Sequence, residues 1–238
     1  GWREAEARVP DVDVRPVLIH GQTLRKDQIP ALEELGIFPS LFPMHTFYWG
    51  DWHRDSVLGP QRAENISPTG WLRERGLRFT THHDAPVALP DSMRVLDTTV
   101  NRTTRSGRVL GENQKVDVMT ALKAMTLWSA QQHFEEDRKG SIEVGKLADF
   151  VVLSDNPLTV PTSSLIDLHV EETIKEGETI YRREARTSGA APPALGLAPA
   201  LAGHRHDHGQ HGHGQYGGDG CFAPGLEVIF HTFTGTQH

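Results

Sequence analysis

The sequence has almost no cysteine, no long apolar run and no excess of positive charge, and each absence excludes a class of protein. Cys221 is the single cysteine, so an intrachain disulfide and a zinc ribbon are both excluded. No apolar run approaches the roughly 20 residues that a membrane-spanning helix needs. The formal net charge of −7 argues against a nucleic-acid partner, because phosphate binding requires a basic face. We therefore expect a soluble globular protein with neither a membrane nor a nucleic-acid partner.

The chain also lacks an ordinary beginning. GWREAEARVP has no initiator methionine, no signal peptide and no helix N-cap, and it reads as the last turns of a helix already under way. We therefore expect further residues before Gly1. Localisation cannot be read from such a start, and cytoplasmic is our default expectation.

Three short apolar runs predict strands, and each run ends at a polar side chain. VLIH ends at His20, PSLFPMH at His45 and LRFTTHHD at Asp84. Strands that alternate with helices predict a parallel sheet, whose carboxyl ends gather the chemistry. We expect one pocket to hold all three side chains. Helical patterns accompany the strands at Gln28–Leu35 before Gly36, from Ser67–Pro68 to Gly76, after Asp91, and from Asp117 through Trp128 and Ser129.

The pattern changes after residue 137. KGSIEVGKLADFVVLSDNP and VEETIKEGETIYRRE predict short strands, with EG as a hairpin turn. From about Arg186 the sequence is rich in Ala, Pro and Gly, and then in His and Gly, which is typical of a disordered tail. The chain therefore divides into an α/β region at 1–137, a small β unit at 138–183 and a low-complexity tail at 184–238.

Two histidines and an aspartate from separate strands suit a hydrolytic metal site. Neutral imidazole is a good ligand for Zn²⁺, and a carboxylate can both ligate and move protons. A bound metal lowers the pKa of water towards ~7, and a carboxylate can accept that proton and return it to a leaving group. From the pattern alone, an ordinary hydrogen-bonded loop is the favoured interpretation of these residues.

The combination of LIHGQ, FPSLFPMH, THHDAPV, KGSIEVGKLADFVVL and TIKEGETIY resembles the amidohydrolase superfamily. It is most similar to amidohydrolase family 3, the YtcJ-like branch that includes N-substituted formamide deformylase. The resemblance covers about residues 1–183. It implies an α/β fold, namely the C-terminal half of a distorted (β/α)₈ TIM barrel with part of a small β-sandwich. It also implies one or two divalent metal ions, with Zn expected first and Fe or Ni as alternatives.

The same resemblance implies roles for three residues. His20 and His45 match the metal-ligand histidines of the fifth and sixth barrel strands. Asp84 matches the eighth-strand aspartate, which contacts metal or water and shuttles the proton. The family's His-x-His pair and its bridging ligand have no counterpart here, so we expect the complete site to need a missing N-terminal half or a second copy in a homodimer.

Other side chains near these residues have weaker assignments. His83 could contact substrate or point away, and we expect neither His82 nor His83 to bind metal. Trp49, Trp52 and His53, within FYWGDWH, could line a substrate pocket or only pack a loop. The three arginines of RTTRSGRVLG could meet an anionic group, although a solvated loop is the expected interpretation.

We therefore expect a metal-dependent hydrolase that cleaves a non-peptide C–N bond in a small amide-like molecule. Two alternatives remain at this point. The chain could be an inactive half-barrel remnant or a partner subunit. It could also bind or store metal through its tail, where five histidines stand in a Gly-rich segment, namely His204, His206, His208, His211 and His213.

Overall fold

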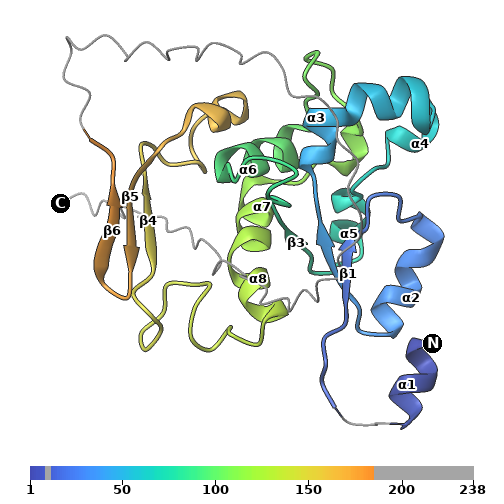
Figure 1. Ribbon diagram of the computed structural model, residues 1–238, viewed down its shortest axis with the longest axis horizontal. Helices are drawn as coiled ribbons and strands as arrows, with labels where there is room; N and C mark the ends of the chain where they lie inside the picture. Colours follow the sequence, from blue (N-terminus) through green and yellow to red (C-terminus); the bar gives the residue numbers. More distant parts are fainter. Residues whose placement is uncertain (9–11, 185–238) are drawn as a thin grey trace, which may run out of the picture. The chain divides into compact units, whose positions relative to one another are not determined.

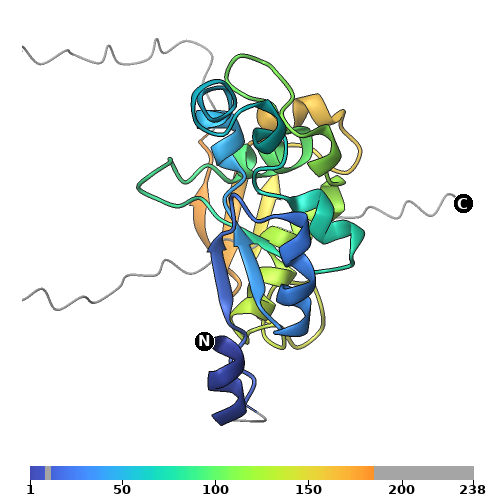
Figure 2. The same cartoon turned by 90° about the vertical axis from the view of Figure 1, so that its right-hand side faces the viewer.

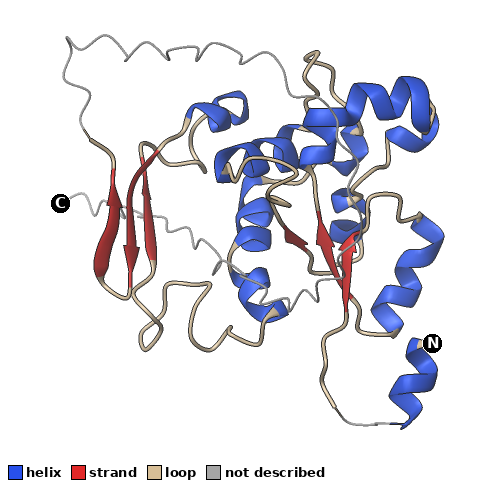
Figure 3. Cartoon of the chain, in the orientation of Figure 1, coloured by secondary structure: helices blue, strands red, loops and turns tan. Residues whose placement is uncertain are grey.

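The described part of the chain contains two separate three-stranded sheets, and most of its short helices gather around the parallel one (Figure 3). The computed structural model describes residues 1–8 and 12–184 of the 238 residues. The predicted tail, from residue 185 onward, lies outside the described residues. Within the described ranges, none of the helices is both long and apolar enough to cross a bilayer.

The first sheet is parallel and contains the strands that the sequence predicts. Its order is β1-β2-β3, and His20 lies opposite Leu41, which in turn lies opposite Thr81. The three strands therefore end at one level, as the carboxyl ends of parallel strands do. The bounds are Val17–His20 for β1, Phe38–Leu41 for β2 and Thr80–Thr81 for β3.

Helices connect these strands and follow the last one, so the fold is mixed α/β (Figure 1). α1 (Trp2–Arg8) precedes β1, and Figure 2 shows α2 running beside β1 and β2. The remaining bounds are η1 Lys26–Gln28, α2 Ile29–Glu34, α3 Met44–Trp52, η2 His53–Val57, α4 Pro60–Ala63, α5 Thr69–Glu74, α6 Ser92–Asn101, η3 Glu112–Gln114, α7 Val118–Met125 and α8 Leu127–Gln132.

Apolar side chains of these helices form one main cluster against the parallel sheet. Ile29 of α2, Leu72 of α5, Leu96 of α6 and Leu122 of α7 are almost fully buried in it, together with Phe79 just before β3. Each buried side chain of this size stabilises the fold by about 1.5–3 kcal/mol. The core therefore fixes the helices on the sheet and, with them, the loops that leave its carboxyl ends.

The second sheet is antiparallel, in the order β4-β5-β6. The predicted EG turn joins β5 to β6, with Glu176 at φ 51° and Gly177 at φ 86°, which suits a tight hairpin. A helical turn before β5 contributes Leu165 to the main cluster. The bounds are β4 Phe150–Leu153, η4 Thr162–Asp167, β5 Val170–Lys175 and β6 Glu178–Arg182.

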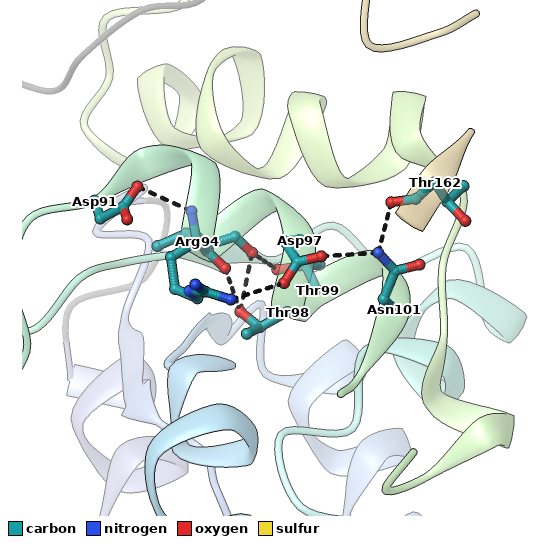
Figure 4. Close-up of polar contacts among 8 residues, drawn as sticks. Asp91, Arg94, Asp97, Thr98, Thr99, Asn101 and Thr162 are labelled. Atoms are coloured by element: carbon teal, nitrogen blue, oxygen red, sulfur yellow. Dashed lines mark hydrogen bonds and ion pairs between the residues drawn. The ribbon is translucent and has the colours of Figure 1, made fainter. Parts of the chain in front are cut away.

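A polar network on α6 shows how the helix is started and attached (Figure 4). Asp91 accepts a hydrogen bond from the Arg94 backbone N–H at 3.1 Å, which confirms it as the N-cap. Asp97 is buried, and it accepts from Arg94 and from Asn101. Asn101 also donates to the carbonyl of Thr162 at 2.7 Å, so the network ties α6 to η4.

Four local predictions are wrong in detail. β2 ends at Leu41, and His45 lies in the first turn of α3, because the chain turns into helical geometry at Pro43. β3 ends at Thr81, so Asp84 lies in the turn after it. Ser67 does not cap α5; it has φ 46° and donates to the Phe42 carbonyl. The helix expected after Asp117 is divided into α7 and α8 at Thr126.

Candidate metal centre

Three potential metal ligands meet at the carboxyl end of the parallel sheet. They are His20 at the end of β1, and His82 and Asp84 in the segment that follows β3. One ligand atom from each lies within 4.8 Å of the others. His20 Nε2 and Asp84 Oδ2 are 3.2 Å apart, and the rings of His20 and His82 are 5.1 Å apart. Two imidazoles and a carboxylate at this spacing can hold one divalent cation.

The backbone at two of these residues is in an uncommon conformation. His20 has φ 64° and Asp84 has φ 56°, in the left-handed region that non-glycine residues rarely adopt. Such residues concentrate at functional sites, where the surrounding structure maintains the strain. Here the left-handed turns direct the chain sharply away from the sheet directly after the two ligands.

His82 belongs to the group, contrary to the expectation from the sequence. Its backbone N–H donates to the Leu41 carbonyl at 3.0 Å, which continues the strand pairing one residue beyond β3. One ligand atom of His82 lies within 4.8 Å of one on Asp84 and one on His20, so the three side chains converge. The spacing of two residues between His82 and Asp84 was the signal in the sequence that could have identified His82 as a potential ligand.

His45 lies beside this group rather than within it. Its ring is 6.1 Å from that of His20, and it packs against Phe42 at 4.5 Å and Trp49 at 5.7 Å. The Phe42 ring also stacks on His82, at 5.4 Å with an interplanar angle of 18°. His45 is therefore a neighbour of the ligand group on an aromatic platform, where a small displacement of either could bring them together.

Burial keeps His45 and His82 neutral. Burial, with smaller contributions from the nearby His53 and His20, lowers the pKa of His45 to about 4. Burial also lowers the pKa of His82 to about 4, with His20 as the next contribution. Neutral imidazole is the form that binds metals. Within the described ranges, His45 Nδ1 and His82 Nε2 are buried and have no hydrogen-bond partner, so the donor set fits a cation.

The other side chains predicted to contact substrate either have a partner within the protein or are exposed. His83 Nε2 lies 3.1 Å from Ser92 Oγ, and His53 Nε2 lies 3.0 Å from Gln22 Nε2. Trp49 packs on His45, whereas Trp52 is 57% exposed. The structure thus gives His83 a local partner and places Trp49 and His53 next to His45.

The three arginines of residues 102–111 have protein partners. Arg102 is fully buried and donates to the carbonyls of Leu110, Ser67 and Ile66 at 3.0, 3.0 and 2.7 Å. Arg105 lies over the Tyr48 ring at 5.7 Å, and Arg108 lies 3.9 Å from Asp51. A fully buried arginine was not foreseen from the sequence, because only tertiary contacts supply its acceptors.

A mixed α/β fold with a His–His–Asp group at the ends of parallel strands is typical of a metal-dependent hydrolase. A sequence model described as the amidohydrolase family matches residues 1–181. The chain therefore belongs to the amidohydrolase family.

Two characterised or named relatives are similar over most of this chain. N-substituted formamide deformylase of Arthrobacter pascens is 28% identical over 185 residues, which are 76% of this chain and 33% of that protein. The putative amidohydrolase YtcJ of Bacillus subtilis (strain 168) is 27% identical over 169 residues, which are 70% of this chain and 32% of that protein. The chain thus spans about a third of the length of these relatives.

Solved structures share the fold. An adenosine deaminase from Xanthomonas campestris, with bound zinc, has a TM-score of 0.52 at 23% identity, over 74% of this chain and 39% of that one. An uncharacterised metal-dependent hydrolase from Pyrococcus horikoshii has a TM-score of 0.50 at 24% identity, over 63% and 30%. At these identities the similarity concerns the fold alone.

Proposed function

We propose that this chain carries part of the active site of a metal-dependent amidohydrolase that cleaves a non-peptide C–N bond in a small amide-like molecule. The observation that carries the proposal is the convergence of His20, His82 and Asp84 within 4.8 Å. Membership of the amidohydrolase family and the similarity to a protein named N-substituted formamide deformylase support the reaction type.

The donor set favours a divalent cation of intermediate softness. Imidazole and carboxylate together suit Zn²⁺ first, and Fe²⁺ and Ni²⁺ as alternatives. His20, His82 and Asp84 would hold the ion, with His45 as a further ligand after a small movement. When bound, such an ion acidifies a water molecule and polarises a carbonyl oxygen.

Asp84 has the position and chemistry of the proton carrier. Its carboxylate is partly exposed, so a water and a substrate can reach it, and His20 Nε2 holds Oδ2 at 3.2 Å. A carboxylate so placed can take the proton from the attacking water and then deliver it to the departing nitrogen. Trp49 and His53 lie on the side of His45 and are our candidates for substrate contact, with the exposed Trp52 beyond them.

Over the ranges that the structure describes, the parallel sheet has open edges, as a part of a larger barrel would have. β1 and β3 each pair only with β2 within the described residues. Ile19 of β1 is 56% exposed, and a groove of about 640 Å³ runs along β1 and α2. We propose that strands of a longer polypeptide, or of a second copy, pair with β1 to extend the sheet towards a (β/α)₈ barrel. An open parallel edge readily accepts such a strand.

The test is amine release from N-substituted formamides by this chain assembled with the strands that we propose to pair with β1, in a longer polypeptide or in a second copy, supplied with Zn²⁺, Fe²⁺ or Ni²⁺ in turn. We expect metal-dependent release that the Asp84→Asn variant abolishes, because the amide cannot carry the proton. Asp91→Asn is the matched control, since it makes the same change at a helix N-cap and should leave the rate unchanged. Absence of release with all three metals, or equal release without Asp84, would contradict the proposal.

A further inference from the structure

One face of α3 is turned towards the metal centre and the opposite face towards a hairpin. His45, Trp49 and His53 follow one another at intervals of four residues, so they share a face. The ring of His45 lies 5.7 Å from Trp49 and 6.0 Å from His53. We call His45 and Trp49 of α3, together with His53 at the start of η2, the histidine face of α3.

The hairpin formed by residues 103–109 packs on the other side of the helix. Thr103 pairs with Val109, and the Thr104 backbone N–H donates to the Arg108 carbonyl at 2.8 Å. A Cβ added at Gly50 would lie 2.9 Å from Thr104 Cγ2. Glycine at position 50 therefore permits the close approach of the hairpin to α3.

Asp51 makes side-chain hydrogen bonds between the helix and the hairpin, in addition to the backbone hydrogen bond from the Arg105 N–H to the Phe47 carbonyl at 3.1 Å. Its carboxylate accepts from Thr104 Oγ1 at 3.0 Å, from Ser106 Oγ at 2.8 Å and from the Ser106 backbone N–H at 3.2 Å. Burial acts to raise the pKa of Asp51, but the hydrogen bonds from Ser106 and Thr104 outweigh it and lower the pKa. The carboxylate is thus charged and fully engaged on the side of α3 opposite the histidine face.

The base of the hairpin is itself fixed. Arg102 immediately precedes it, and its buried guanidinium donates to the carbonyls of Leu110, Ser67 and Ile66. The hairpin therefore offers α3 a rigid support rather than a movable loop.

We propose that Asp51 is a positioning residue: by fastening α3 to the hairpin at 103–109, it sets how closely His45, Trp49 and His53 approach the His20–His82–Asp84 centre. The functional meaning of this distance rests on the function proposed above. The claim that Asp51 places α3 does not depend on that proposed function.

A residue that only stabilises the fold would behave differently from one that positions α3. Loss of general stability lowers the unfolding midpoint and leaves the native environment of His45 and His53 unchanged. Loss of positioning moves these rings relative to Phe42 and Trp49, and neighbouring aromatic rings shift the proton resonances of an imidazole. Histidine ring NMR of the metal-free full chain separates the two cases.

The decisive comparison is Asp51→Asn against Asp55→Asn. Asp55 lies one turn further along and 3.7 Å from the same Arg108, but it makes no hydrogen bond to the hairpin. Both variants lose one negative charge, and only Asp51→Asn replaces an oxygen that accepts a hydrogen bond from the hairpin by an NH₂ group, which cannot accept one. We expect the His45 and His53 ring resonances to move in Asp51→Asn and to stay unchanged in Asp55→Asn, with His83 and His169 constant in both.

Thr104→Val provides a second variant in case Asp51→Asn fails to fold. It keeps the shape of the side chain and removes one of the hydrogen bonds to Asp51, so a smaller movement of the same two resonances is expected. Unchanged His45 and His53 resonances in a folded Asp51→Asn, or in Thr104→Val where the former does not fold, would overturn the proposal. Equal movement in Asp55→Asn would overturn it as well.

A cobalt titration of the same proteins separates this proposal from the proposed function. We expect Asp51→Asn to weaken the Co²⁺ binding that depends on His20 by several-fold, less than the roughly 10- to 100-fold loss that follows removal of a group hydrogen-bonded to a metal ligand. If the wild-type chain shows no Co²⁺ binding that depends on His20, the proposed function is contradicted. The result from the ring resonances would still hold. Intact His20-dependent binding with unmoved resonances would contradict the positioning role alone.

Discussion

At the scale of single residues, His82 is the most informative side chain of the candidate metal centre. It is extended, it continues the pairing of β3 with Leu41, and it points to the same side as Asp84. His83, its neighbour, is turned towards Ser92 on α6. The alternation of an extended segment therefore decides which of two adjacent histidines faces the metal centre.

The first prediction compares these two histidines. His82→Ala removes an imidazole from the ligand group, so Co²⁺ affinity at the centre should fall at least 10-fold, as expected when a direct ligand is lost. His83→Ala removes only the contact with Ser92 and should leave the affinity within about twofold. Calorimetric titration of both variants with Co²⁺ measures the difference. Equal losses in the two variants would show that His82 is not a ligand.

The sequence predicted the positions of some candidate ligands better than others, because it shows local patterns but not the path of the chain. His20 ends the apolar run VLIH, and Asp84 lies three residues beyond the end of β3; the sequence named both as candidates. His45 was placed at a strand end, whereas Pro43 begins a helix that carries it. Arg102 gave no signal at all, since its three carbonyl acceptors come from residues 66, 67 and 110.

At the scale of elements, caps and stops in the sequence predict the helices well. Asp91 and Asp117 both cap helices, as expected, and Gly36 and Gly76 follow the ends of α2 and α5 in left-handed geometry. The kink between α7 and α8 was not foreseen, because Thr126 is an ordinary helical residue in the sequence and adopts φ −124° and ψ −92° only in the folded chain.

The second prediction concerns the Asp117 cap of α7. Its carboxylate accepts from the Thr120 backbone N–H at 2.9 Å and from Thr120 Oγ1 at 2.6 Å. Asp117→Ala should lower the free energy of unfolding by about 1 kcal/mol, whereas Asp117→Asn should lower it by only a few tenths, because asparagine is an equally good N-cap. Urea unfolding at pH 7 checks both values, and equal losses would contradict the capping role.

The same cap has a predictable dependence on pH. Burial acts to raise the pKa of Asp117, but the hydrogen bonds from Thr120 outweigh it, so the pKa lies below its ordinary value of 3.8. A carboxyl with a lowered pKa in the folded state stabilises the protein above its unfolded pKa and loses this contribution as the pH falls through the folded pKa. The difference between wild type and Asp117→Ala should therefore shrink below pH 3.8.

At the scale of the whole molecule, the described residues give a three-stranded parallel sheet with one candidate metal centre and an antiparallel sheet beside it in sequence. The chain matches the amidohydrolase family over residues 1–181 and spans about a third of its relatives' length. The resemblance in the sequence predicted this family correctly. The completion of a barrel around the centre, and the role of the histidines after residue 203, remain proposals.

Zinc stoichiometry of the full chain tests the central claim most directly. Three proteins are compared by competition with a zinc chelator: wild type, His20→Ala, and a chain in which His204, His206, His208, His211 and His213 are glutamine. The account predicts one tightly bound equivalent in wild type, which the glutamine variant retains and His20→Ala loses. Tight binding that survives in His20→Ala and disappears in the glutamine variant would contradict it and would assign the metal to the tail.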